Sequence, residues 1–151
     1  MSKLKCKWEE GCKPRFSEGD AGLDLRAHPK GSEEFLTFGE DSEYTIIPGQ
    51  VQGIPTGLKI EFPEGYCGLI FPRSSTGRAG LEIANTVPVI DNSFTGEITV
   101  FVTSRTTMTL KAYERFAQIV LVPYYQVSEL EYGEPRETER GDGSFGSTGS
   151  F

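Results

Sequence analysis

The apolar residues of this chain come in short runs, and each run ends at residues that favour turns. Proline, glycine or an Asp-Asn-Ser sequence interrupts the apolar pattern, and long helix-forming runs of Ala, Leu, Glu and Lys are missing. Short strands with regular turn signals are typical of sandwiches and barrels. The pattern therefore predicts an all-β domain with strands at 43–47, 56–62, 66–71, 81–90, 97–103 and 115–125.

Two of these predicted strands show how the domain is expected to bury its side chains. In 97–103, one set of alternate residues is apolar, and it consists of Ile98, Val100 and Val102. The other set consists of Thr99, Phe101 and Thr103. This alternation indicates a strand with one face in the core. The segment 115–125 is nearly continuously apolar, which favours burial on both faces.

The composition changes towards the end of the chain. Residues 1–131 are expected to form the β domain, whereas 132–151 contain mainly glycine, serine, threonine and charged residues. Such a segment buries too little apolar surface to stay ordered alone, so a mobile tail is the ordinary interpretation. Its 140–149 stretch also combines a cation, an aromatic ring, glycines and hydroxyls. These groups indicate a phosphate grip that becomes ordered when the ligand binds.

Charge and cysteine content exclude several classes of protein. The net charge of −7 argues against a general binder of duplex DNA, although a small anionic ligand needs only a few placed cations. Cys6, Cys12 and Cys67 form an odd, sparse set that is typical of reduced thiols in the cytoplasm. No second Cys or His pair follows Cys6 and Cys12, which disfavours a zinc site. With no signal segment or membrane-spanning apolar run, we expect a soluble protein.

Two polar segments are candidates for carrying chemistry, and the first of them has the groups to bind an anion. Segment 72–78 carries two arginines and three hydroxyl residues, and Ser74 is expected to cap a short helical turn there. An ordinary hydroxyl-rich loop is an equally good interpretation. In segment 85–91, an extended strand would place Asn85, Val87, Val89 and Asp91 on one face. An isolated aspartate at a turn is more often structural.

Two further polar residues interrupt apolar surroundings. Asp24 lies among apolar residues in segment 21–27, where a turn or salt-bridge role is the common one. Gln118 interrupts the apolar run 115–125. A buried glutamine needs hydrogen-bond partners, so it either joins a network or faces a ligand. Phe94, just past the turn at 91–93, is either a core residue or a flat surface for a sugar ring.

Taken in chain order, these segments resemble the five motifs of the trimeric dUTPase family. They are 21–27, 72–75, the 85–97 hairpin, 115–119 and the 140–149 tail, and together they span almost the whole chain. The resemblance implies a jelly-roll β-barrel that assembles as a homotrimer with active sites at the subunit interfaces. It implies hydrolysis of dUTP to dUMP and pyrophosphate, which removes dUTP from the nucleotide pool and supplies dUMP for thymidylate synthesis.

The resemblance also implies a role for each matching residue in the chemistry. Asp91 would activate the water that attacks the α-phosphorus. Asp24 would hold Mg²⁺, the implied cofactor, through a coordinated water. The phosphate oxygens would be bound by Arg73, Ser74, Ser75 and Gln118. The tail of a further subunit would close over the nucleotide, with Arg140 on the γ-phosphate, Phe145 on uracil, and Gly146, Ser147 and Thr148 around them.

Selection of uracil over other bases is the remaining implied role. The base edge would meet Asn85 and the backbone of Val89, Ile90 and Asp91, while Phe94 would lie against the deoxyribose. Thr99 would also face the substrate. The chain departs from the usual family pattern at three positions. Phe94 stands where tyrosine is more usual, and Ser75 and Pro88 stand where glycine is common, so Pro88 cannot donate a hydrogen bond to the base.

The sequence leaves two alternatives to a dUTPase open. Arg78 and the 73–78 loop resemble the dCTP deaminases, which share the fold, but those enzymes need a glutamate where this chain has Phe101. The other alternative is a non-catalytic trimer that binds a regulatory protein, because fold alone does not establish function. Such a trimer is expected to have lost Asp91 or Arg140, and both are present. No sequence feature supports a regulatory protein partner, and neither duplex nucleic acid nor a membrane is an expected partner.

Overall fold

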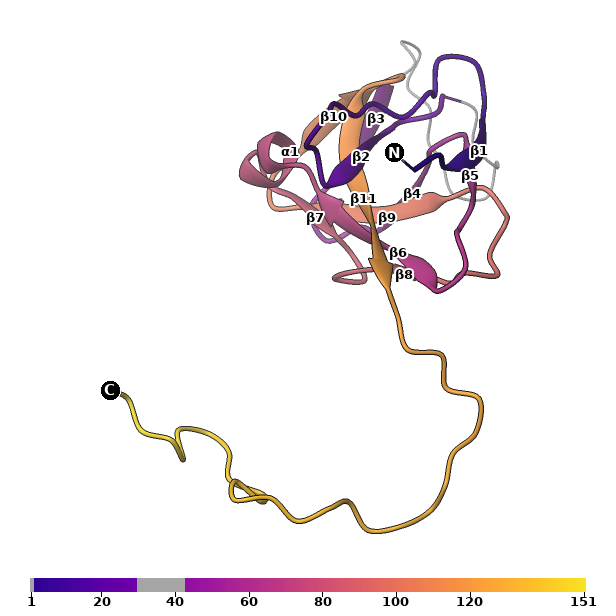
Figure 1. Cartoon of the computed structure of the whole chain (residues 1–151). Helices are drawn as coiled ribbons and strands as arrows, with labels where there is room; N and C mark the ends of the chain where they lie inside the picture. Colours follow the sequence, from indigo (N-terminus) through magenta and orange to yellow (C-terminus); the bar gives the residue numbers. More distant parts are fainter. Residues whose placement is uncertain (1, 30–42) are drawn as a thin grey trace.

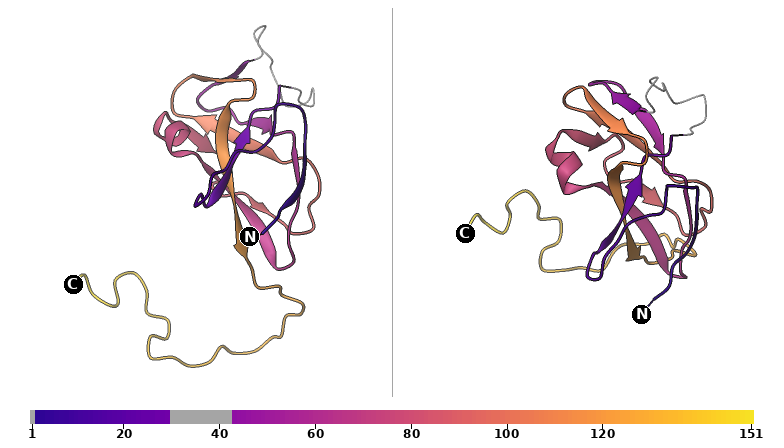
Figure 2. Two further views of the ribbon diagram at one scale, coloured as in Figure 1. Left: turned by 45° about the horizontal axis from the view of Figure 1, so that its top comes forward. Right: turned by 90° about the horizontal axis from the view of Figure 1, so that it is seen from above.

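The structure is a computed structural model that describes residues 2–29 and 43–151. Within these residues the fold is almost entirely β, which confirms the predicted class, and one short helix interrupts it (Figures 1 and 2). No helix in these two ranges is long and apolar enough to cross a membrane. The elements are β1 (Lys5–Trp8), β2 (Gly22–Arg26), β3 (Glu43–Ile46), β4 (Gln52–Pro55), β5 (Leu58–Glu61), β6 (Tyr66–Pro72), α1 (Ser74–Arg78), β7 (Leu81–Ile83), β8 (Val89–Ile90), β9 (Thr99–Ser104), β10 (Met108–Lys111) and β11 (Arg115–Pro123).

The strands pair antiparallel in four sheets rather than closing into one continuous barrel. Their orders are β2-β11-β6-β8, β4-β9-β7, β1-β5 and β10-β3. The core lies between the sheets. Val100 and Val102 on β9, and Ile98 just before it, are each at most 1 % exposed, as the alternation predicted. On β11, Phe116, Ala117 and Ile119 are buried, but the strand is only half-buried from Val120 to Val122.

The predicted strand 81–90 is wrong in its middle part. It breaks into β7 and β8, with a turn between them in which the Thr86 N–H donates to the Ile83 carbonyl. Thr86 has a φ of 67°, which no strand residue adopts. Asn85 and Val87 therefore do not share a strand face with Val89 and Asp91. Pro88 has no N–H to donate, but its carbonyl accepts from the Ile70 N–H of β6, and the strand β8 that pairs with β6 begins at Val89.

The capping prediction at Ser74 also needs correction. The helix α1 begins at Ser74 itself, and its N-cap is Arg73, whose backbone is extended and whose side chain makes no cap hydrogen bond. Inside the helix, the buried Thr76 hydroxyl lies 2.8 Å from the Phe116 carbonyl and 3.2 Å from the Arg73 carbonyl, and it donates its one proton between them. Thr76 thus fastens the 73–78 segment to β11, and this fastening fixes where Arg73 emerges.

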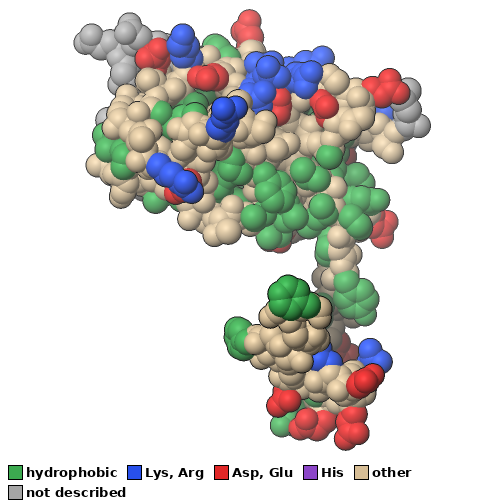
Figure 3. Space-filling view, turned by 90° about the vertical axis from the view of Figure 1, so that its left-hand side faces the viewer, with side chains coloured by type: hydrophobic (Ala, Val, Ile, Leu, Met, Phe, Trp, Pro, Cys, Tyr) green, Lys and Arg blue, Asp and Glu red, His purple; other side chains and the backbone are tan. Residues whose placement is uncertain are grey.

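Residues 124–151 contain no helix or strand and extend away from the domain in all views (Figures 1 and 2). In the space-filling view the far part of this tail forms a separate body (Figure 3). Its aromatic side chains at Tyr132, Phe145 and Phe151 are fully exposed. Only the start of this segment contacts the domain: the Tyr124 N–H donates to the Gly65 carbonyl, and residues 124–127 line a cleft with Cys67 and Val89.

Candidate active site

A polar cleft of about 240 Å³ lies where β2, β6 and β11 meet α1. Strand β11 pairs with both neighbours, and Gln118 stands directly opposite Asp24 on β2. Arg73 and Ser74 follow the end of β6 and reach the same cleft. The cleft is lined by Arg15, Asp20, Ala21, Gly22, Asp24, Arg73, Ser74 and Gln118. The fold thus brings together Asp24, Arg73, Ser74 and Gln118, four residues that the sequence pointed to separately.

Two arginines bind the Asp24 carboxylate in this cleft. Arg73 Nε lies 3.2 Å and Arg115 Nη1 3.1 Å from Asp24 Oδ2. The Asp24 side chain is 14 % exposed, so water screens these ion pairs less than it screens surface pairs. Two cations against one carboxylate leave this group with a net charge of about +1, which suits an anionic ligand. Arg115 begins the 115–119 motif, but nothing in the sequence pattern indicated a role for its side chain.

Gln118 has its amide fixed by the backbone of the neighbouring strand. Its Nε2 donates to the Pro72 carbonyl at 3.1 Å, while its Oε1 lies over Gly22. A Cβ added at Gly22 would be 2.6 Å from that oxygen. The Gln118 amide is therefore part of a hydrogen-bond network, and its side chain also lines the cleft.

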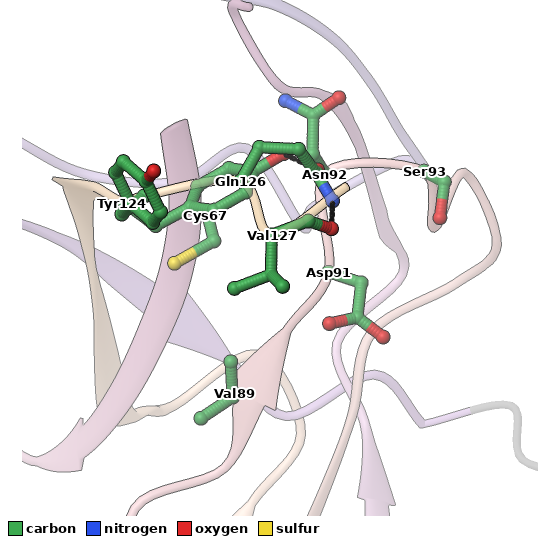
Figure 4. Close-up of a pocket in the computed structure, with 9 residues that line it drawn as sticks. Cys67, Val89, Asp91, Asn92, Ser93, Tyr124, Gln126 and Val127 are labelled. Carbon is green, nitrogen blue, oxygen red and sulfur yellow. Dashed lines mark hydrogen bonds between the residues drawn. The ribbon is translucent and has the colours of Figure 1, made fainter. Parts of the chain in front are cut away.

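Asp91 lies in a second cleft, of about 460 Å³, at the other end of β6 (Figure 4). Cys67, Val89, Asp91, Asn92, Ser93 and residues 124–127 line it. The Asn92 amide donates to the carbonyls of Pro63 and Tyr66, both at 2.8 Å, and thereby holds the chain beside Asp91. Within the described ranges, the Asp91 carboxylate is exposed and receives no hydrogen bond. It is therefore available to a water molecule or a ligand.

The two clefts lie far apart within one chain. Since β8 pairs Ile90 with Gly68, Asp91 lies beside Cys67. Arg73 is six residues further along an extended backbone. At about 3.3 Å per residue this separation is about 20 Å. Figure 1 shows the same arrangement, with α1 near one end of β6 and β8 near the other. One copy of the chain cannot bring Asp91 and Arg73 to the same phosphorus atom.

Of the other residues predicted for the base and sugar, Val89 lines the Asp91 cleft, and Ile90, Phe94 and Asn85 lie outside its lining. The Phe94 ring, 43 % exposed, covers Gly96, where a Cβ would be 2.9 Å from the ring. The Phe94 N–H donates to the Asp91 carbonyl, which closes the turn. Val89 lines the cleft, and Ile90 is the last residue of β8, directly before Asp91. Asn85 lies in the exposed turn before β8.

Three further groups of predicted site residues also lie in neither cleft. Thr99 packs over Gly53 on the adjoining strand, with its Cγ2 3.2 Å from where a Gly53 Cβ would stand. Ser75 is exposed on α1. In the tail, Arg140 donates to the Gly143 carbonyl, and the 140–149 segment forms tight turns of its own. The predicted residues Arg140, Phe145, Gly146, Ser147 and Thr148 therefore contact neither cleft of their own chain.

The groups with shifted pKa values lie away from both clefts. Burial raises the pKa of the Cys12 thiol, and the nearby Glu97 and Glu9 carboxylates raise it further. Burial likewise raises the pKa of Cys6. Tyr44, whose hydroxyl donates to the His28 carbonyl, has a pKa of about 12 for the same main reason. Cys6 and Cys12 are therefore not activated nucleophiles. All three cysteines are free.

No cluster of three His, Cys, Asp or Glu that could hold a metal ion occurs among residues 2–29 and 43–151. Mg²⁺ usually keeps several waters and takes one or two carboxylates together with substrate phosphates. With Oδ2 of Asp24 bound to both arginines, Oδ1 is the oxygen that remains for a water of that kind.

Comparisons with known proteins show which family the chain belongs to. The dUTPase family model matches residues 11–149. The deoxyuridine 5'-triphosphate nucleotidohydrolase of Escherichia phage T5 is 40 % identical over 99 % of both chains. The protein of the same name from Paraburkholderia phymatum is 41 % identical and covers 87 % of this chain and 84 % of its own.

Solved structures show the same fold. A mutant dUTPase of Staphylococcus bacteriophage 80alpha with dUpNHpp superposes with a TM-score of 0.77 at 23 % identity, covering 99 % of this chain and 100 % of its own. A mutant dUTPase of phage phi11 of S. aureus, described with a structural Mg(II) ion, has a TM-score of 0.70 at 19 % identity and covers 88 % and 98 % of the two chains. On the family match and these identities, the chain belongs to the dUTPase family.

Proposed function

We propose that this chain hydrolyses dUTP to dUMP and pyrophosphate at sites shared between the subunits of a homotrimer. The activity accords with the names of its relatives, which are nucleotidohydrolases and not deaminases. One observation supports the shared site: the exposed Asp91 carboxylate and the cationic cleft at Arg73 lie about 20 Å apart by strand length. Asp91 of one subunit must therefore face Arg73 of another.

Exposed apolar side chains support an interface beside Asp91. Val89, Tyr125 and Val127 are 62 %, 91 % and 53 % exposed, and Tyr66 adds a further 40 % exposed ring. Figure 3 shows hydrophobic side chains gathered on the domain where the tail leaves it. Contiguous apolar patches of this kind usually mark sites that another chain covers. A neighbouring subunit on this patch would bring its own phosphate cleft towards Asp91.

In the proposed reaction, Asp91 accepts a proton from the water whose oxygen attacks the α-phosphorus. The bond between that phosphorus and the α,β-bridging oxygen breaks, and the electron pair leaves with pyrophosphate. Arg73, Ser74 and Gln118 hold the phosphate oxygens in line for this attack. Mg²⁺, when bound near Asp24, supplies charge that offsets the negative charge of the phosphates. Before this attack, the tail is proposed to close over the nucleotide and to exclude bulk water, while the attacking water stays beside Asp91.

Uracil recognition is proposed to use the free edge of β8. This two-residue strand is the last in its sheet, so within the described part of the chain one side of its backbone has no strand partner. Backbone groups of Val89 and Ile90, with Asn85 nearby in sequence, can then pair with the base edge. Cytosine would set donor against donor there and leave buried groups unpaired, which discriminates strongly.

Pyrophosphate release tests the proposed activity. The chain is incubated with dUTP, dTTP, dCTP or UTP, each with and without Mg²⁺. Rapid release is expected with dUTP and Mg²⁺, and little with the other nucleotides. Ammonia release from dCTP, with no pyrophosphate from dUTP, would instead identify a deaminase.

Gly22→Ala is expected to lower kcat/KM for dUTP by about 10- to 100-fold, the scale of loss when a positioning group shifts by about 1 Å. The new methyl group would lie 2.6 Å from Gln118 Oε1 and push that amide out of the cleft. Steady-state kinetics measure the effect. Gly133→Ala is the matched control, because nothing lies within 4 Å of a Cβ at residue 133. Equal kinetics for the two variants would remove Gln118 from substrate binding.

A further inference from the structure

Arg115 is joined to the phosphate cleft by two contacts of different kinds. Its guanidinium Nη1 donates to Asp24 Oδ2 at 3.1 Å. Its backbone carbonyl accepts a hydrogen bond from Arg73 Nη1 at 3.2 Å. Arg73 Nε binds the same Asp24 oxygen, at 3.2 Å. Arg115, Asp24 and Arg73 thus form a closed ring of contacts that links β11, β2 and the end of β6.

Arg115 itself does not line the cleft, whereas Asp24 and Arg73 do. Its side chain is 34 % exposed, against 14 % for Asp24. Any effect of Arg115 on a ligand in the cleft therefore passes through the other two residues. This arrangement distinguishes it from Arg73, which reaches the cleft directly.

We propose that Arg115 is a positioning residue that frees Arg73 for the triphosphate. Without Arg115, Asp24 and Arg73 would neutralise each other, and the cleft would lose its excess positive charge. With Arg115 present, Asp24 is shared between two cations, and Arg73 keeps charge for the phosphates. The inference rests on the proposed function, since it names how the phosphate cleft of that site is kept cationic.

The backbone contact adds orientation to this charge effect. A guanidinium has five N–H donors in a fixed plane. For Arg73, Nε is used by Asp24 and one Nη1 donor by the Arg115 carbonyl, so the other N–H groups remain for phosphate oxygens. The pairing of β11 with β2 is irregular between Arg115 and Ala117. This irregularity sets the position of the carbonyl that Arg73 binds.

A double-mutant cycle tests the proposal through binding of dUpNHpp, measured by calorimetry on the full chain with Mg²⁺. Arg115→Gln is expected to weaken binding by about 10- to 100-fold, the range for losing hydrogen bonds to charged groups. KM for dUTP should rise in parallel, with a much smaller change in kcat. In an Asp24→Asn background, the same substitution should cost less than about threefold, because residues that share a partner are not additive.

Arg115→Lys is measured both in the unsubstituted chain and in Asp24→Asn. It provides the same double-mutant cycle should Arg115→Gln fail to fold. Lysine keeps the positive charge but lacks the planar guanidinium with its paired N–H donors. The loss of dUpNHpp binding for Arg115→Lys should therefore be smaller than that for Arg115→Gln, but larger than zero. Arg105→Gln is the control, since Arg105 binds Glu82 at 2.7 Å on the exposed surface. Equal losses of binding in the two backgrounds would overturn the inference. Failure of the unsubstituted chain to bind dUpNHpp and to hydrolyse dUTP would overturn the proposed function and this inference together.

Discussion

Replacing Asp91 with asparagine is expected to lower kcat for dUTP by about 10²–10⁴-fold, the usual contribution of a general base. Asparagine has nearly the same size but cannot take the proton from the attacking water. Affinity for dUTP should change little, because the phosphate contacts come from the other cleft. The Asp91 carboxylate is exposed and receives no hydrogen bond within the described ranges, so its loss should not unfold the domain.

Turnover by Asp91→Asn is measured as pyrophosphate release, and affinity as calorimetric binding of dUpNHpp. Glu64→Gln is the matched control, because Glu64 is an exposed carboxylate in the turn before β6. It should keep the kinetics of the unsubstituted chain. A kcat for Asp91→Asn within about threefold of that chain would show that another group activates the water.

Removing residues 140–151 is expected to leave a folded oligomer with at least about 10²-fold lower kcat/KM, the scale of losing preorganised donors on a developing charge. The reason for retained folding is direct: Phe145 and Phe151 are fully exposed, and the segment packs on no part of its own domain. The reason for lost activity is that Arg140 and the hydroxyls of the grip are gone. Circular dichroism, sedimentation and pyrophosphate release together measure both effects.

A pair of point variants separates the proposed grip from the rest of the tail. Phe145→Ala should raise KM for dUTP, because its ring is proposed to stack on uracil. Phe151→Ala removes an equally exposed ring outside the 140–149 segment and should change neither KM nor kcat. If the truncated chain, or Phe145→Ala, behaves like the unsubstituted chain, the tail has no part in the mechanism.

Local sequence pattern was enough to predict the class of the fold and its clearest strand. The alternation at Ile98, Val100 and Val102 reports burial on one face directly, and all three are buried. The pattern of apolar residues could not predict the turn at Thr86 that separates β7 from β8. The residues from Leu81 to Ile90 read as one run, but the chain turns at Thr86, and β8 exists only because β6 lies beside it. Pairing between distant segments decides such short strands.

In the candidate site too, residues within one sequence motif were predictable, whereas contacts between segments far apart in sequence were not. The segments carrying Asp24, Arg73 and Gln118 were all recognised by residue type and order, and the fold brings these residues into one cleft. The contact between Asp24 and Arg115, 91 residues apart in sequence, depends on the register of β2 against β11. No single segment shows that register, which explains why Arg115 received no role.

Mixed trimers test the shared site most directly. Asp91→Asn and Arg73→Gln homotrimers should each be nearly inactive, since each lacks one half of every site. Trimers reassembled from equal amounts of the two variants should regain about a quarter of the normal rate of dUTP hydrolysis, because a quarter of the interfaces then join an intact Asp91 to an intact Arg73. Mixtures as inactive as the separate variants, although shown to have exchanged subunits, would contradict a site built from two chains.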